Sequence, residues 1–118
     1  LVMLKKFILI LALLVSFAEA KDIIKLKSID EIKEGKHTIV MFSMNFCPWC
    51  MRQRSVLEEH ITPLYPDIDV FEAKLGTDTY NELVNTTGIE IKYHPTTALM
   101  KKEDGELVII FEFYGYSC

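Results

Sequence analysis

The chain has 118 residues, of which 50% are hydrophobic, and it carries a formal net charge of −4 at neutral pH. This length and composition fit one globular domain with a single core. The acidic balance excludes a basic nucleic-acid-binding surface, so we expect no nucleic-acid partner.

The first twenty residues have the features of a secretory signal peptide. Two lysines precede a short apolar run, and Ala18-Glu19-Ala20 supplies small residues at the two positions that a signal peptidase reads. The apolar run is short for a membrane span, which needs about 20 residues. We therefore predict a signal peptide at 1–20 and a mature domain at 21–118, with an uncleaved membrane anchor as the alternative. An exported domain enters a compartment where disulfides persist.

Three elements are predicted in the first part of the mature domain. Residues 23–26 are a candidate short strand. Ser28 and Glu31 have capping-box spacing, which predicts a helix of about two turns that Gly35 ends. Residues 38–42 form a short, continuous apolar run rich in β-formers, which is typical of a buried strand.

A helix is predicted next, from about Met51 to Leu64, because apolar positions repeat there with helical spacing. Cys47 then lies near the N-cap of this helix. Pro48 occupies the first helical position, where the missing N–H of proline costs nothing. The prolines at 63 and 66 end the helix.

The second half of the chain contains a strand, a helix and a hairpin. A second capping-box pattern, Thr79-Tyr80-Asn81-Glu82, predicts a helix start, and Gly88 its end. Asp104-Gly105 is a strong hairpin signal. The three predicted strands are 68–74, 97–101 and 107–113. The whole order predicts an α/β fold with a central mixed sheet and helices on both faces.

The pair Cys47-Pro48-Trp49-Cys50 is the candidate reactive centre. Free N–H groups at a helix N-terminus stabilise a thiolate, which favours Cys47 as a nucleophile. Cys50 follows three residues later on the same face of the first turn. Helix geometry places two such Cα atoms about 5 Å apart, within the ~4.4–6.8 Å range of a disulfide. The pair therefore predicts a redox switch that opens and closes without backbone movement.

Two other uses of these cysteines stay open. One is a permanent structural disulfide. The other is a zinc site, but structural zinc needs four ligands. The remaining candidate ligands contain no second close pair; they are Cys118, His37, His60 and His94. We expect no metal and no organic cofactor.

The chain resembles the thioredoxin superfamily over about residues 22–116. The resemblance rests on the element order, on the Cys-x-x-Cys pair at the helix after the central strand, and on His94-Pro95-Thr96 about 45 residues later. It implies a thioredoxin-like fold in which Pro95 is cis and lies against the pair, with a trans turn proline as the alternative. It also implies that Cys47 attacks a substrate disulfide and that Cys50 resolves the mixed disulfide.

The resemblance further implies substrate contacts around the pair, in which Thr96 takes part. Trp49 would cover the disulfide as an apolar contact, with ordinary surface packing as the alternative. His94 would lie close to Cys47. A protonated ring would stabilise the thiolate, a neutral ring would hydrogen-bond substrate, and an exposed loop histidine is the third interpretation. Pro48 would support the active site through the helix start.

The chain departs from the thioredoxin pattern in three places. Met41 stands where thioredoxins carry a buried Asp that helps to deprotonate the resolving Cys. Cys-Pro-Trp-Cys replaces their Cys-Gly-Pro-Cys. The C-terminal helix of that family is missing, and its loss would leave an apolar patch on the sheet. We interpret this as truncation, with coverage of the face by residues 1–20 or by a partner as the alternatives. Cys118 is an odd thiol at the end, either incidental or part of an intermolecular bridge.

The combined pattern resembles exported thioredoxin-like reductases of bacterial envelopes. It implies an enzyme that exchanges thiols and disulfides on exported, disulfide-containing proteins in the periplasm. Its electron donor would be a membrane or periplasmic thiol, and we expect a monomer. The reducing direction is preferred. The alternatives are a periplasmic disulfide oxidase or isomerase, and a non-enzymatic binding or chaperone module.

Overall fold

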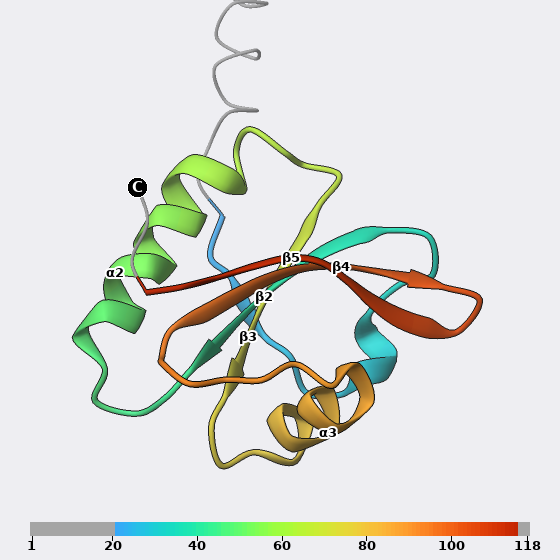
Figure 1. The fold of residues 1–118 in the computed structure, drawn as a ribbon. Coiled ribbons are helices and arrows are strands. Elements are labelled where there is room, and N and C mark those ends of the chain that lie inside the picture. Colours follow the sequence, from blue (N-terminus) through green and yellow to red (C-terminus); the bar gives the residue numbers. More distant parts are fainter. Residues whose placement is uncertain (1–20, 116–118) are drawn as a thin grey trace, which may run out of the picture.

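The computed structural model describes residues 21–115, which form a five-stranded mixed sheet with a helix on each face (Figure 1). The strands in spatial order are β1 (Ile24–Lys25), β3 (Asp69–Lys74), β2 (His37–Ser43), β4 (Thr96–Glu103) and β5 (Glu106–Tyr114). Strand β3 is parallel to β1 and β2, whereas β4 is antiparallel to β2, and β5 to β4. The predicted α/β fold with a central mixed sheet is confirmed.

The predicted signal peptide at 1–20 and Cys118 lie outside the described residues. Within residues 21–115, no helix combines the length and the apolar character that crossing a bilayer requires.

Strand β2 occupies the middle of the sheet because its side chains are apolar on both faces. Val40, Met41 and Phe42 each have 0% of their surface exposed. A strand covered on both faces reads as a continuous apolar run rather than an alternating one. The prediction of a buried strand at 38–42 is confirmed, with one more residue at each end.

Helix α3 (Asp78–Thr87) covers one face of the sheet, and α2 (Pro48–Val56) with the π-helical turn η2 (Leu57–Ile61) covers the other (Figure 1). On the α3 face Leu83 is fully buried, and Tyr80 meets Phe42 edge to face at 5.5 Å between ring centroids. The apolar cluster on this face has eleven buried members: Leu26, Ile32, Val40, Phe42, Phe71, Ala73, Tyr80, Leu83, Ile89, Ala98 and Met100. The cluster on the α2 face has three buried members, Met41, Leu57 and Val70.

The predicted two-turn helix before Gly35 is wrong. The capping box of Ser28 and Glu31 is present, but it starts only the 3-10 turn η1 (Ile29–Glu31). The following residues instead join the sheet, because Glu34 forms a parallel bridge with Lys102 and the Gly35 N–H donates to the Lys102 carbonyl at 2.7 Å. Pairing with the sheet satisfies backbone groups that a short helix leaves open.

The start of α3 also differs from the prediction. The N-cap is Thr77, whose hydroxyl accepts the Tyr80 N–H, and the helix begins at Asp78. The Thr79 hydroxyl, which the sequence pattern assigned to the cap, instead donates to the Lys27 carbonyl at 2.8 Å. Gly88 ends the helix in the left-handed conformation at φ 72°, as predicted.

The hairpin of β4 and β5 is present as predicted, but one extra residue on β5 changes which face its side chains serve. Ile109 pairs with Met100, whereas Phe111 pairs with Leu99, so the register shifts by one between them. This β-bulge turns the strand over. Ile109 therefore packs against the α3 cluster, while Phe111 lines the α2 face.

An apolar groove of about 340 Å³ lies between α2, η2 and the strands β4 and β5. Its apolar lining comes from both layers: Ile39, Val56, Leu57, Ile61, Leu99, Phe111 and Phe113. Phe111 is 60% exposed.

Candidate active site

The chain enters α2 directly from the end of β2, and this transition positions Cys47. Cys47 is the N-cap of α2 with extended backbone, and its Sγ accepts a hydrogen bond from the Cys50 N–H at 3.1 Å. Pro48 occupies the first helical position. An acceptor at this position satisfies one of the free N–H groups of the helix N-terminus, and those groups also favour negative charge.

Cys47 and Cys50 form a disulfide whose Cα atoms are 5.2 Å apart, which agrees with the spacing predicted for the first turn of a helix. Both residues are buried, but unequally. Cys47 keeps 8% of its surface exposed and Cys50 keeps 2%. Cys47 is therefore the cysteine more open to an incoming disulfide, and Cys50 lies behind it.

The loop before β4 brings Pro95 to the disulfide. The His94–Pro95 peptide bond is cis, and Pro95 is fully buried. The His94 carbonyl oxygen lies 3.9 Å from Cys47 Sγ. The Gly115 N–H donates to the Pro95 carbonyl at 2.7 Å, which ties the loop to the end of β5. The structure thus brings together the two motifs that are separated by 47 residues in the sequence.

The His94 ring points to α3 rather than to the disulfide. Its Nε2 lies 2.7 Å from the Tyr80 hydroxyl, and the two rings stack with centroids 5.9 Å apart. Burial lowers the pKa of His94 below its ordinary value and raises the pKa of Tyr80. Burial therefore favours the neutral form of the ring over the imidazolium. The contact with Tyr80 also argues against the interpretation of His94 as an exposed loop residue.

The other predicted site residues are distributed between surface and interior. Trp49 is 53% exposed, and the Arg52 guanidinium carbon lies 4.8 Å from its ring centroid. Thr96 is fully buried, and its hydroxyl donates to the Tyr93 carbonyl at 2.6 Å. Its side chain thus supports the loop from inside.

A cavity of about 380 Å³ opens beside the disulfide and is lined by Trp49, Tyr93, His94, Tyr114 and Gly115. Tyr93 and Tyr114 meet edge to face at 6.0 Å. Sequence reasoning missed both tyrosines. Tyr93 could have been found, because it directly precedes the His-Pro-Thr motif, whereas Tyr114 comes to the site only through the hairpin.

A buried polar group on the α2 face was also missed. Glu72 of β3 is 3% exposed, and its Oε2 accepts hydrogen bonds from the Ser43 hydroxyl at 2.6 Å and from Arg54 of α2. The sequence signal was a single acidic residue inside the otherwise apolar middle of a strand. Charged residues are rarely buried unless they are paired, so such a residue marks either an edge or a special environment.

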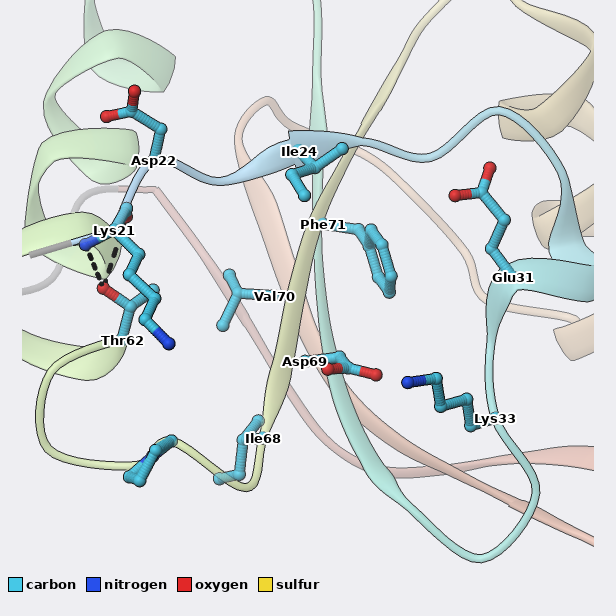
Figure 2. Close-up of a pocket in the computed structure, with 11 residues that line it drawn as sticks. Lys21, Asp22, Ile24, Glu31, Lys33, Thr62, Ile68, Asp69, Val70 and Phe71 are labelled. Carbon is cyan, nitrogen blue, oxygen red and sulfur yellow. Dashed lines mark hydrogen bonds between the residues drawn. The ribbon is translucent and has the colours of Figure 1, made fainter.

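A second cavity, of about 430 Å³, lies at the β1 edge of the sheet and contains none of the predicted site residues. Figure 2 shows that both signs of charge surround it, including Lys21, Glu31, Lys33 and Asp69, and that the Lys21 backbone is hydrogen-bonded to Thr62. Within residues 21–115, no three His, Cys, Asp or Glu side chains are grouped as metal ligands would be.

No protein-family model matches the chain, and no curated protein matches its sequence. Several solved structures match its fold. Thioredoxin from Trichomonas vaginalis has a TM-score of 0.62 and 22% identity, with 80% of this chain and 87% of that chain covered. Mitochondrial thioredoxin 3 from Saccharomyces cerevisiae, in its oxidized form, has a TM-score of 0.58 and 23% identity, with coverage of 79% and 83%. An uncharacterized thioredoxin-like protein from Clostridium perfringens has a TM-score of 0.61 and 23% identity, with coverage of 81% and 72%. The chain therefore has a thioredoxin-like fold.

Proposed function

We propose that this protein is a thiol–disulfide oxidoreductase that uses Cys47 and Cys50 as its redox pair. The observation that carries the proposal is the position of the disulfide, with Cys47 at the N-cap of α2 and 3.9 Å from the carbonyl oxygen of the cis His94–Pro95 unit. The thioredoxin-like fold of the chain supports the same assignment. The proposed nucleophile Cys47, the resolving thiol of Cys50 and the backbone carbonyl of His94 therefore lie together.

The reaction proceeds by two exchanges. The Cys47 thiolate, which the N–H groups of α2 stabilise, attacks one sulfur of a substrate disulfide and releases the other sulfur as a thiolate. Cys50 then attacks Cys47 Sγ, the bond between Cys47 and substrate breaks, and the second substrate sulfur leaves. Two electrons pass from the protein dithiol to the substrate, and no other cofactor is needed.

We propose the reducing direction. Reduction potentials of such pairs range from about −270 to −120 mV, and stabilisation of the reduced thiolate makes a pair more oxidising. A cation beside Cys47 would push the pair in the oxidising direction. His94 does not supply one, because burial lowers its pKa and its ring contacts Tyr80. This absence of a nearby imidazolium supports a reductase over an oxidase.

The proposed substrates are exported proteins that contain disulfides. Apolar side chains surround the pair on the surface, with Phe46 fully exposed, Met51 64% exposed and Tyr93 65% exposed. Such a rim suits a polypeptide whose disulfide is flanked by apolar residues. The signal-peptide pattern of residues 1–20 supports action in an exported compartment, with a thiol protein as electron donor.

The test is reduction of insulin disulfides by the reduced protein, together with equilibration of the Cys47/Cys50 couple against glutathione. A reductase predicts turnover and a midpoint potential near the lower end of the range given above. The Cys50→Ser variant should accumulate mixed disulfides with exported proteins in cells. A wild-type protein that reduces nothing, with a Cys50→Ser variant that traps nothing, would favour a binding module with a permanent structural disulfide.

A further inference from the structure

We propose that Tyr80 is a positioning residue for the redox pair, because it holds His94 so that the carbonyl oxygen of His94 favours the thiol over the thiolate at Cys47. The inference rests on the proposed function and concerns what sets its direction. The N-terminus of α2 favours the thiolate of its N-cap residue. A neighbouring group that favours the thiol opposes this effect and makes the pair more reducing.

The contact that favours the thiol is made by the backbone of residue 94. The His94 carbonyl oxygen lies 3.9 Å from Cys47 Sγ. In the reduced protein the Cys47 S–H can donate to this oxygen, whereas a thiolate has no proton to donate and meets the negative end of the carbonyl dipole. Hydrogen bonding to the neutral form of an acid disfavours its charged form. Cys47 is only 8% exposed, so water screens the contact weakly.

The ring of His94 supplies an anchor that its own backbone lacks. The next residue is fixed through its backbone, since the Gly115 N–H donates to the Pro95 carbonyl at 2.7 Å. In the part of the chain that the structure describes, His94 has one hydrogen bond besides its contact with Cys47. This bond joins Nε2 to the Tyr80 hydroxyl at 2.7 Å, and the two rings stack with centroids 5.9 Å apart. Tyr80 therefore restrains the residue whose carbonyl faces the sulfur.

Tyr80 is itself held by the core under α3. It is 6% exposed and belongs to the same buried cluster as Leu83. Its ring meets Phe42 of the central strand edge to face at 5.5 Å between centroids, and its N–H donates to the Thr77 hydroxyl. Close packing leaves a buried side chain little freedom to move. The core thus fixes the Tyr80 hydroxyl, and the hydroxyl fixes the ring of His94.

The direction of this hydrogen bond also keeps His94 neutral. Burial raises the pKa of Tyr80, so its phenol keeps the proton. A buried O–H needs an acceptor, and a ring nitrogen of neutral imidazole can be one. The bond then occupies the lone pair of Nε2, while burial lowers the pKa of His94. Tyr80 therefore opposes positive charge on the loop, and positive charge near Cys47 would favour the thiolate.

Few other polar or charged groups surround the sulfur. The cavity beside the disulfide has no Asp, Glu, Lys or Arg in its lining, which consists of Trp49, Tyr93, His94, Tyr114 and Gly115. The guanidinium carbon of Arg52 lies 4.8 Å from the ring centroid of Trp49. From α2, the Cys50 N–H donates to Cys47 Sγ at 3.1 Å and favours the thiolate. The His94 carbonyl is the contact that opposes it.

The first experiment measures the ionisation of Cys47 alone. All proteins carry Cys50→Ser and Cys118→Ser, which leave Cys47 as the single thiol of the sequence. The rate of alkylation by iodoacetamide is followed against pH, because only the thiolate reacts. Tyr80→Phe keeps the ring and removes the hydroxyl. It should move the profile to lower pH and raise the rate on the acid side about two- to tenfold, which is what one net hydrogen bond contributes.

The second experiment measures the redox pair, in proteins that carry only Cys118→Ser. The protein disulfide and two molecules of reduced glutathione are equilibrated with the protein dithiol and one molecule of oxidised glutathione. At a pH above the midpoint of the alkylation profile, Tyr80→Phe should shift this equilibrium toward the dithiol, also about two- to tenfold. The variant would thus be the more oxidising protein.

Controls distinguish positioning through His94 from a general effect on the fold. Tyr65→Phe removes a hydroxyl from a tyrosine that is 51% exposed and should keep the wild-type alkylation profile. His94→Ala should shift the profile in the same direction as Tyr80→Phe, and adding Tyr80→Phe to it should cause no further shift.

Two results would overturn the proposal. One is a wild-type alkylation profile in Tyr80→Phe. The other is an equal shift by Tyr80→Phe with and without His94→Ala, because Tyr80 would then act by a route other than His94. A Tyr80→Phe shift in a protein whose wild type reduces no insulin would support the positioning role and instead overturn the proposed function.

Discussion

The two faces of the sheet are covered by one helix each, yet they bury different chemistry. Under α3 the buried layer is a continuous apolar cluster centred on Phe42 and Leu83. Under α2 the buried apolar cluster is small, and beside it lie polar residues, Ser43, Gln53 and Glu72, together with Cys50. The difference teaches that one face supplies most of the apolar burial that stabilises the fold. The α2 face buries fewer apolar side chains and holds the disulfide cysteine Cys50 and several polar side chains.

One contact links the active-site loop to the α3 face. Tyr80 belongs to the α3 cluster, and its hydroxyl contacts the ring of His94, whose carbonyl oxygen lies near Cys47 Sγ. The loop that carries Pro95 is therefore positioned partly from the stable side of the sheet. Four substitutions sharpen this comparison.

The largest effect is expected at the disulfide. Cys47→Ser removes the nucleophile, so insulin reduction should fall to the uncatalysed rate while the unfolding transition of the reduced protein stays close to that of reduced wild type. Turnover is followed by insulin precipitation, and stability by urea denaturation. Ser55→Ala, an exposed change on the same helix, is the matched control. Retained insulin reduction by Cys47→Ser would contradict the assignment of the redox chemistry to the α2 face.

The second effect belongs to the α3 face. Leu83→Ala leaves a cavity in the apolar cluster, and it should lower the free energy of unfolding by about 2–5 kcal/mol. Urea denaturation measures the loss. The midpoint potential of the folded fraction should not change, because Leu83 touches the other side of the sheet. Asn81→Ala, exposed on the same helix, should stay within about 0.5 kcal/mol of wild type.

A smaller effect tests which residue caps α3. Thr77→Ala removes the acceptor for the Tyr80 N–H and should lower the free energy of unfolding by about 1 kcal/mol. Glu82→Ala removes the side chain that the sequence pattern assigned to a capping box and should change stability by less than about 0.5 kcal/mol, because Glu82 is exposed. If Glu82→Ala is the more destabilising of the two in urea denaturation, the N-cap is Thr79 after all.

The smallest effect is a pH dependence that links the two faces. Burial lowers the pKa of His94 below its ordinary value of 6.5. The unfolded chain therefore binds more protons at this site as the pH falls below about 6.5, and stability declines from there toward the lower folded pKa. His94→Asn should flatten this part of the stability curve. His60→Gln, on the exposed side of η2, is the control that should keep the slope.

The local part of the site was predictable from sequence, because helix starts and Cys spacing are local properties. Cys47, Pro48 and Cys50 fall where the pattern of a buried strand followed by a helix places them. The partner of His94 was not predictable, since Tyr80 reaches it only when α3 packs on the sheet. Glu72 meets Arg54 and Ser43 through strand register and helix packing, which no short window of sequence records.

The fold was predicted in element order and strand position, and the errors have tertiary causes. Residues 32–35 follow a capping box, yet pairing with Lys102 draws them away from helix. The hydroxyl of Thr79 is engaged by the Lys27 carbonyl, so the cap moves to Thr77. The bulge in β5 sends Ile109 and Phe111 to opposite faces, although simple alternation would put them together.

Trp49 is the single tryptophan of the sequence, and it stands between the two cysteines with half of its surface exposed. A neighbouring disulfide quenches indole emission, so opening the pair should brighten the protein without any added dye. The fluorescence of Trp49 should therefore report whether the Cys47–Cys50 pair is oxidised or reduced. A redox titration of the purified protein could follow that signal in real time.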